Sequence, residues 1–256
     1  RDDIRYIRQT GMNTIRIPFH YKLFTDEDYM GLSANQDGFQ RLDSLVSWCR
    51  ESNIYLILDM HDAPGGQTGD NIDDSYGYPW LMTSELSQQQ FAEIWKKIAD
   101  HYKNEPVILG YDLLNEPIAT YFPDEKEKLN AALEPVYKRA VAAIREVDKN
   151  HLIVIEGNWF ANDFSGLTPA WDTNMAYSFH KYWTVNNTAS IQWVLDLRNN
   201  TNCPIWLGES GENSNRWFTD CIELMEKNNI GWSFWPVKKS GINNVLKVTP
   251  TAITQI

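Results

Sequence analysis

Two glutamates follow short apolar segments of this sequence, and their residue types permit acid–base chemistry. Glu116 stands between Asn115 and Pro117, directly after an apolar run, and Glu209 follows the run at 205–208. Two carboxyl groups that face one another can cleave a glycosidic bond, because one protonates the leaving oxygen while the other stabilises or attacks the anomeric carbon. The sequence therefore predicts glycoside hydrolysis, provided that the fold brings these two segments together.

The gap between the two carboxyl groups sets the stereochemistry of such a reaction. At about 5 Å the second carboxylate is a nucleophile and configuration is retained, whereas a gap of roughly 6.5 to 9.5 Å admits water and inverts it. An Asn-Glu-Pro sequence taken alone also fits a strand end followed by a helix cap. The chemistry therefore depends on the elements that position both glutamates.

Seven short apolar runs, many of them β-branched, recur along the chain and are typical of buried parallel strands. They cover residues 13–18, 54–60, 107–114, 152–156, 175–180, 205–208 and 231–235. Amphipathic stretches with helical spacing lie between them, at 39–49, 91–102 and 133–147. Successive strand ends are spaced by roughly 36 residues, which is close to one strand–helix unit. This alternation predicts an α/β fold, the (β/α)₈ TIM barrel.

Length and element count together predict how much of a barrel the chain contains. The 256 residues match the roughly 250 of one barrel, so we expect a single catalytic domain over 1–256. Only seven strands are found, and the expected helix at 2–9 has no strand before it. We therefore expect an N-terminally truncated barrel with strand 1 absent. The segment 62–84 has no periodicity and is expected to be a long loop.

Composition restricts the partners. The net charge is −11 without any basic run, so neither nucleic acid nor an anionic membrane surface is an expected partner. The apolar runs are too short to span a bilayer. The three cysteines show neither a disulfide framework nor metal-ligand spacing. The 11 Trp, 12 Tyr and 10 Phe exceed what a core of this size needs, and such a surplus suits a site that stacks on sugar rings.

A family resemblance extends these expectations. The motifs that carry it occur in order: Thr14 to Pro18, Leu58 to His61, Asn115 to Pro117, His180 to Tyr182, Gly208 to Glu209, and Trp232 to Trp235. From about Asn13 to Trp235 the chain resembles glycoside hydrolase family 5, a large (β/α)₈ family with many cellulases and β-mannanases. The resemblance implies a retaining reaction without a cofactor, with Glu116 as general acid/base and Glu209 as nucleophile.

The resemblance and the strand-end positions also imply a supporting set of residues. We expect Asn115 to bind the sugar 2-hydroxyl, Trp235 to stack under the ring, and Tyr182 and Arg16 to keep Glu209 ionised. Other residues expected to bind substrate or orient Glu116 are His61, His180, Trp159 and Lys238.

Several of these assignments have alternatives. Arg16 could instead pair with a buried carboxylate, and Lys238 could lie on a solvated surface. Glu156, which also ends a strand, is a rival catalytic carboxylate. The two histidines with Asp62 permit a metal site, although no His-x-His or Glu-x-x-His spacing supports one.

The sequence thus favours a monomeric endo-β-1,4-glucanase of the cellulase type, acting on a β-glucan polysaccharide or oligosaccharide. An exo-β-1,3-glucanase or β-glucosidase is the first alternative, because the stretch 59–67 resembles such relatives and the long loop could close one end of a cleft. A β-mannanase, a non-catalytic carbohydrate-binding pseudoenzyme or inactive fragment, and a metal-dependent barrel hydrolase are further alternatives. We expect a secreted or periplasmic protein, with a cytoplasmic one as the alternative.

Overall fold

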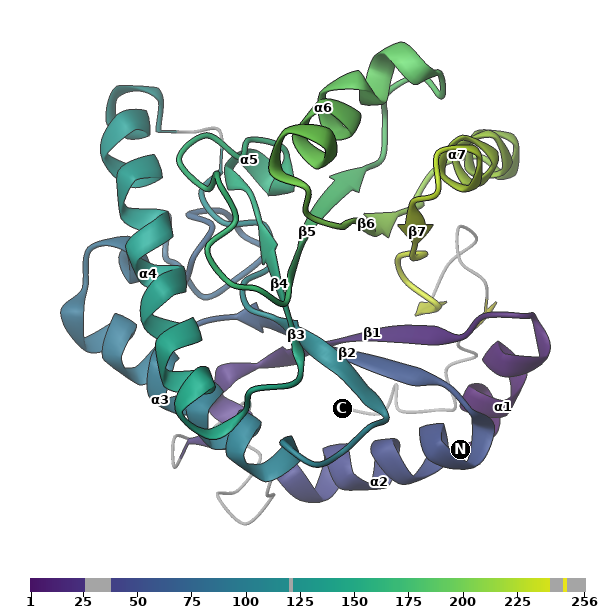
Figure 1. Ribbon diagram of the computed structural model, residues 1–256, viewed down its shortest axis with the longest axis horizontal. Coiled ribbons are helices and arrows are strands. Elements are labelled where there is room, and N and C mark those ends of the chain that lie inside the picture. The colour runs from purple at the N-terminus through teal and green to yellow at the C-terminus, as the bar shows by residue number, and fades with distance from the viewer. Residues whose placement is uncertain (26–37, 120–121, 240–245, 248–256) are drawn as a thin grey trace, which may run out of the picture. The chain divides into compact units, whose positions relative to one another are not determined.

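The computed structural model describes residues 1–25, 38–119, 122–239 and 246–247, in which strands and helices alternate (Figure 1). The strands are β1 Thr14–His20, β2 Tyr55–Asp62, β3 Ile108–Asp112, β4 Leu152–Glu156, β5 Met175–Lys181, β6 Ile205–Ser210 and β7 Gly231–Trp232, followed by the short pair β8 Lys238–Lys239 and β9 Leu246–Lys247. The α-helices are α1 Asp2–Gln9, α2 Gly38–Ser52, α3 Glu85–Tyr102, α4 Lys126–Val147, α5 Asn158–Ala161, α6 Gln192–Thr201 and α7 Asn215–Lys227. Four 3₁₀ turns complete this part of the chain: η1 Tyr21–Phe24, η2 Trp80–Met82, η3 Pro123–Glu125 and η4 Thr188–Ile191.

The chain divides into two compact units, Arg1–Ala176 and Tyr177–Ile256, with the boundary inside β5. In the first unit, β1, β2, β3 and β4 are neighbours in chain order and pair in parallel. Figure 1 shows α2, α3 and α4 lying along these strands. The register pairs Asp59 on β2 directly with Asp112, the last residue of β3, so two carboxyl groups stand side by side.

The helices of the first unit form because their apolar residues recur on one face, which the strands then cover. In α3, seven residues are buried, including Trp95 with no exposed surface. Its first turn is capped by Ser84, whose side chain accepts a hydrogen bond from the Ser87 N–H. Burial of such faces is the main contribution to the stability of helices of this length.

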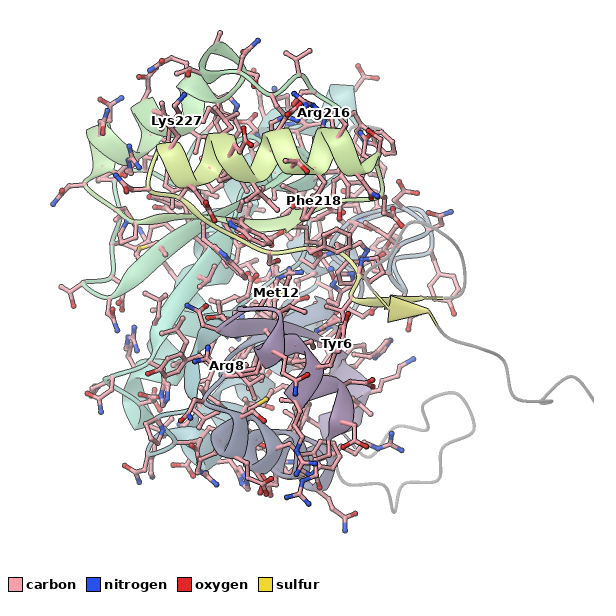
Figure 2. All side chains as sticks on the ribbon, turned by 90° about the vertical axis from the view of Figure 1, so that its right-hand side faces the viewer. Tyr6, Arg8, Met12, Arg216, Phe218 and Lys227 are labelled. Carbon is pink, nitrogen blue, oxygen red and sulfur yellow. The ribbon has the colours of Figure 1, made fainter. Side chains whose placement is uncertain are left out.

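In the second unit, β5, β6 and β7 are again parallel and in chain order. The helix α7 begins at a Ser214 cap and carries Phe218, which Figure 2 labels. The Phe218 ring packs edge-on against Trp232 and Phe234. These aromatic contacts fix the end of β7, because both ring partners belong to that strand or to the two residues after it.

All seven strands expected from the sequence are present as β1 to β7, and together they form one sheet that, in the described part of the chain, has one strand fewer than a complete eight-stranded barrel. β7 is shorter than expected and ends at Trp232. The short helix α5 was not expected, and Trp159 and Phe160 within it have positive φ. The long loop was expected correctly: apart from η2, the segment between Asp62 and Ser84 has no regular element. The single-domain organisation over 1–256 stays a prediction.

Among the described residues, no helix combines the length and the apolar content that crossing a bilayer requires.

Candidate active site

One arginine connects the first four strands. Arg16 on β1 donates from Nε to Asp112 on β3 at 2.8 Å, and its Nη1 lies 3.1 Å from Asp59 on β2. Its Nη2 donates to Asn115 and to Glu156 at the end of β4, both at 3.0 Å. The Arg16 side chain is only 3% exposed and its three carboxylate partners are fully buried. Arg16 therefore pairs with buried carboxyl groups, which was the alternative that the sequence had left open.

The Arg16 cluster holds three carboxyl groups and one guanidinium, so it has an excess of negative charge when all three acids are ionised. Burial, together with the nearby charges of Glu156 and Asp59, raises the pKa of Asp112 well above its usual range, against the opposing effect of Arg16. This shift favours the protonated form of Asp112. Among the described residues, Asp59 Oδ1 and Asp112 Oδ1 are buried oxygens without a hydrogen-bond partner. A proton on Asp112 Oδ1 would turn one of these orphaned acceptors into a donor.

A hydrogen-bonded chain leads from this cluster to Asn115. His61 Nδ1 lies 2.8 Å from Asp59 Oδ2, and His61 Nε2 lies 3.3 Å from Asn115 Nδ2. Because an amide nitrogen can only donate, Nε2 accepts and the ring proton sits on Nδ1, facing Asp59. His61 thus orients the amide of Asn115, whose oxygen accepts from Arg16.

Glu116 is held by its backbone. Its N–H donates to Glu156 Oε2 at 2.7 Å, and its φ is +44°, a left-handed conformation that is uncommon outside glycine. Glu156 uses its other oxygen for Arg16. Glu156, fully buried with both oxygens bonded, is therefore placed as a support of Glu116 and not as a rival catalytic acid.

The long loop folds against the same strand ends. Asp73 accepts from the backbone N–H groups of Gln67 and Thr68, at 2.7 and 2.8 Å. The residues Gln67 and Thr68 in turn accept backbone hydrogen bonds from the segment 118–119, just after Glu116. Trp159 donates its backbone N–H to Ile118 in that segment, so this expected site residue belongs to the surroundings of Glu116.

A cluster of titratable side chains lies where the loop meets β1 and β2. His20 Nε2 lies 2.8 Å from Asp74 Oδ2, and one ligand atom from each of His20, Asp62 and Asp74 falls within 4.8 Å of the others. Burial raises the pKa of Asp62 to about 6, against the lowering effects of His20 and His61. Although burial also acts on Asp74, its hydrogen bonds and attraction to His20 and Lys22 lower its pKa.

The second unit carries the other glutamate. Glu209 on β6 is 4% exposed, and its Oε2 accepts a 2.7 Å hydrogen bond from the Tyr182 hydroxyl. His180 Nδ1 lies 3.7 Å from the same oxygen. A phenol that donates to a buried carboxylate favours the charged form, as a nucleophile requires. Asn213 fixes Tyr182 in turn by donating from its side chain to the Tyr182 carbonyl at 2.9 Å.

Two glycines beside Glu209 allow close packing. A side chain at Gly208 would collide with Ser178, and one at Gly211, where φ is +133°, would come within 2.6 Å of the Trp235 carbonyl oxygen. The Trp235 N–H donates to the Ser210 carbonyl at 2.7 Å. Trp235 is therefore tied to the end of β6 although β7 itself stops earlier.

The structure thus distributes the expected site residues over the two units. Arg16, His61, Asn115, Glu116 and Trp159 lie in the first, and His180, Tyr182, Glu209 and Trp235 lie in the second. Lys238 lies in β8, and its side chain is outside the described part of the structure.

Sequence reasoning missed four residues that surround the site: His20, Asp59, Gln67 and Asp112. The aspartates had a signal, since each is a charged residue inside an apolar strand, and a charge at such a position must be paired. Gln67 had none, because a glutamine in an irregular loop looks like any solvated residue.

Parallel strands alternating with helices, with polar groups at the strand ends, are typical of barrel-type enzymes. Residues 1–241 match the family model described as "Cellulase (glycosyl hydrolase family 5)". The chain belongs to glycosyl hydrolase family 5, and its fold is the (β/α)₈ barrel of that family, represented here by seven strands.

Individual relatives differ in their names. The chain is 28% identical to a β-xylosidase of Phanerodontia chrysosporium over an alignment of 285 positions. This alignment covers 96% of this chain and 58% of the relative. It is 26% identical to Endoglucanase C of Acetivibrio thermocellus over 299 residues, or 93% and 83% of the two chains. The structure of Thermotoga maritima Cel5A in complex with cellobiose superposes with a TM-score of 0.69 at 20% identity, covering 91% of this chain and 81% of that one.

Replacing Arg16 with Met should lower the free energy of unfolding by about 3–5 kcal/mol, because it leaves buried carboxylates without a counter-charge. The matched control is Arg139→Met, which removes the pair with Glu85 across α3 and α4, where both side chains are partly exposed. That change should cost about 1 kcal/mol or less. Urea unfolding measures both values. Equal losses would contradict the role given to the Arg16 cluster.

Replacing Asp62 with Asn should stabilise the protein near neutral pH and have little effect near pH 4. The pKa of Asp62 is about 6 in the folded chain, above its ordinary value, because the fold favours the protonated carboxyl group. The stability that this protonated form contributes is complete at low pH and is lost as pH rises through 6, when the buried group must ionise. The neutral amide avoids this loss. Thermal melts of variant and wild type between about pH 4 and pH 7 measure the difference.

The control for this pH dependence is Asp74→Asn, at the other acidic partner of His20. Because the pKa of Asp74 is lowered, its contribution is present at neutral pH and is lost on acidification. The variant should therefore be destabilised near neutral pH, with a deficit that shrinks as pH falls below about 4. The same sign of pH dependence in both variants would contradict these assignments.

Proposed function

We propose that the protein is a retaining endo-β-1,4-glucanase in which Glu116 is the general acid/base and Glu209 the nucleophile. The observation that carries the proposal is the hydrogen bond from the Tyr182 hydroxyl to Glu209 Oε2, at 2.7 Å. It stabilises the anion of a carboxylate that is 4% exposed, as a nucleophile needs and a resting acid does not. Membership of glycosyl hydrolase family 5 supports the same assignment.

The two glutamates divide the chemistry. In the first step Glu209 attacks the anomeric carbon while Glu116 gives its proton to the leaving glycosidic oxygen. In the second step Glu116 takes a proton from water, which displaces Glu209 and releases the sugar with its original configuration. The proposal requires the two carboxyl groups to face each other across one sugar at about 5 Å.

The remaining polar groups suit binding of a neutral sugar. Asn115, whose amide is oriented by His61 and Arg16, would donate to the 2-hydroxyl, a contact that strengthens in the transition state. Trp235 and Trp159 supply rings, and rings of this kind stack on the apolar faces of sugars. A β-1,4-glucan is favoured because one relative is an endoglucanase and a structural neighbour was solved with cellobiose.

A β-xylosidase is the second candidate, because a relative at 28% identity has that name. A β-mannanase is the third, since the Thermotoga maritima neighbour was also solved with mannotriose. The loop between Asp62 and Ser84, held against the strand ends through Gln67 and Asp73, could close one end of a cleft and so favour exo action. We further propose a secreted or periplasmic location, where a polymeric glucan is accessible.

Glu209→Gln should lower kcat by roughly 10⁴-fold or more, because the neutral amide cannot form the covalent intermediate. Binding of a cello-oligosaccharide, measured by calorimetry, should persist. The graded control is Tyr182→Phe, which removes only the donor to Glu209 and should cost about 1.5–3 kcal/mol of transition-state stabilisation. Unchanged turnover in Glu209→Gln would refute the nucleophile assignment. An inactive wild type that still binds sugar would instead support the pseudoenzyme alternative.

Soluble β-1,4-glucan should be cut to a ladder of oligosaccharides that first appear as β-anomers, the outcome of endo cleavage with retention. Chromatography of the products and proton NMR of the fresh mixture test the two parts separately. Release of a single small sugar would favour exo action, and preference for xylosides or mannan over glucan would overturn the substrate. Loss of activity in EDTA would favour a metal-dependent hydrolase.

A further inference from the structure

The peptide group between Asn115 and Glu116 is hydrogen-bonded at both its carbonyl and its N–H by buried side chains. Its carbonyl, that of Asn115, accepts a 2.9 Å hydrogen bond from Gln67 Nε2. Its N–H, that of Glu116, donates to Glu156 Oε2 at 2.7 Å. Gln67 and Glu156 both have no exposed surface. The orientation of this one peptide plane is thus set by two side chains that come from a loop and from β4.

Each gripping side chain is itself held in place. Gln67 accepts from the Ala63 N–H at 3.0 Å and donates its second proton to the His61 carbonyl at 2.7 Å. Glu156 accepts from Arg16 at 3.0 Å. The Tyr137 hydroxyl fixes the backbone of Glu156 by donating to its carbonyl at 2.8 Å and accepting from its N–H at 3.2 Å. Neither side chain can leave the peptide without breaking further buried hydrogen bonds.

These hydrogen bonds matter because the backbone of Glu116 is strained. A φ of +44° costs a residue with a side chain of the order of 1 kcal/mol or more, and such a conformation persists only where its surroundings enforce it. Since φ fixes the direction in which the side chain leaves the backbone, release of the peptide would turn the carboxyl group of Glu116 away from its present direction.

We propose that Glu156 and Gln67 are positioning residues that aim the proton of Glu116 at the leaving oxygen. The proposal rests on the function proposed above for Glu116. It predicts a specific defect: proton delivery to the leaving group fails, while binding and nucleophilic attack remain. A purely structural role would weaken all steps alike.

The test uses Glu156→Gln and two substrates that differ only in their need for an acid. Arg16 and the Glu116 N–H bond to different oxygens of Glu156, and in the variant an NH₂ group replaces one of them, so one of the two donors loses its acceptor in this geometry. One substrate is an unactivated cello-oligosaccharide, whose leaving oxygen must be protonated. The other is the matching 2,4-dinitrophenyl β-glycoside, whose leaving group departs as a stable anion. For each, kcat/KM reports the glycosylation step.

The value of kcat/KM for the oligosaccharide should fall by about 10- to 100-fold, a part of the 10²–10⁴ that general acid catalysis contributes. For the dinitrophenyl glycoside it should fall by less than about 3-fold, because no proton is needed there. Gln67→Met, which removes the donor to the Asn115 carbonyl, should show the same split. It also serves as the second test if Glu156→Gln does not fold.

Asp148→Asn is the matched control. The Asp148 side chain is equally buried and accepts hydrogen bonds from the backbone N–H groups of Asn150 and His151. It lies just before β4, at the end of the strand opposite Glu156. Its change should alter stability but affect both substrates alike.

Equal losses on both substrates in the Glu156 and Gln67 variants, no loss on either substrate, or failure of both variants to fold would overturn the positioning role. If the wild type cleaves neither substrate, the proposed function itself fails, and this outcome is distinct from the others.

Discussion

A single buried guanidinium constrains how four neighbouring strands can be arranged. Arg16 on β1 bonds to Asp59 on β2, Asp112 on β3 and Glu156 at the end of β4. Buried carboxylates are tolerated only when they are paired or protonated. Here one cation contacts three carboxyl groups, and burial together with the charges of Glu156 and Asp59 raises the pKa of Asp112. A slip of one residue in any strand would move its acid to the opposite face, so the cluster also fixes the register.

From this cluster the order extends outward to the groups that would touch substrate. Asp59 orients His61, which orients Asn115, and Glu156 carries the contact with Arg16 on to the backbone of Glu116. The steps are hydrogen bonds of 2.7 to 3.3 Å between groups that are buried or partly buried, so little freedom remains. Pre-organisation of this kind is what catalysis needs, because misplacement of a reacting group by about 1 Å can cost on the order of 100-fold in rate.

The second unit prepares its glutamate by different means. Glu209 receives a hydroxyl from Tyr182, while Gly208 and Gly211 let Ser178 and the backbone of Trp235 approach closely. A donor hydrogen bond favours ionisation of Glu209, whereas the hydrogen bonds to the Asn115–Glu116 peptide act on the direction of the Glu116 side chain. The two glutamates thus have different hydrogen-bonding environments. Different environments are the usual way in which an enzyme gives two carboxyl groups different pKa values.

The sequence by itself determined the strands, the strand ends that carry chemistry and the family, because apolar runs and the residues after them are local patterns. It placed Glu116, Glu209, Asn115 and Tyr182 at those ends. Only the tertiary structure decided that Glu156 supports Glu116, that Arg16 pairs with three acids, and that Gln67 reaches back to the Asn115 carbonyl. The reason is physical: hydrogen bonds between residues 40 to 140 positions apart leave no periodic trace in the chain. They exist only once parallel strands bring their ends together.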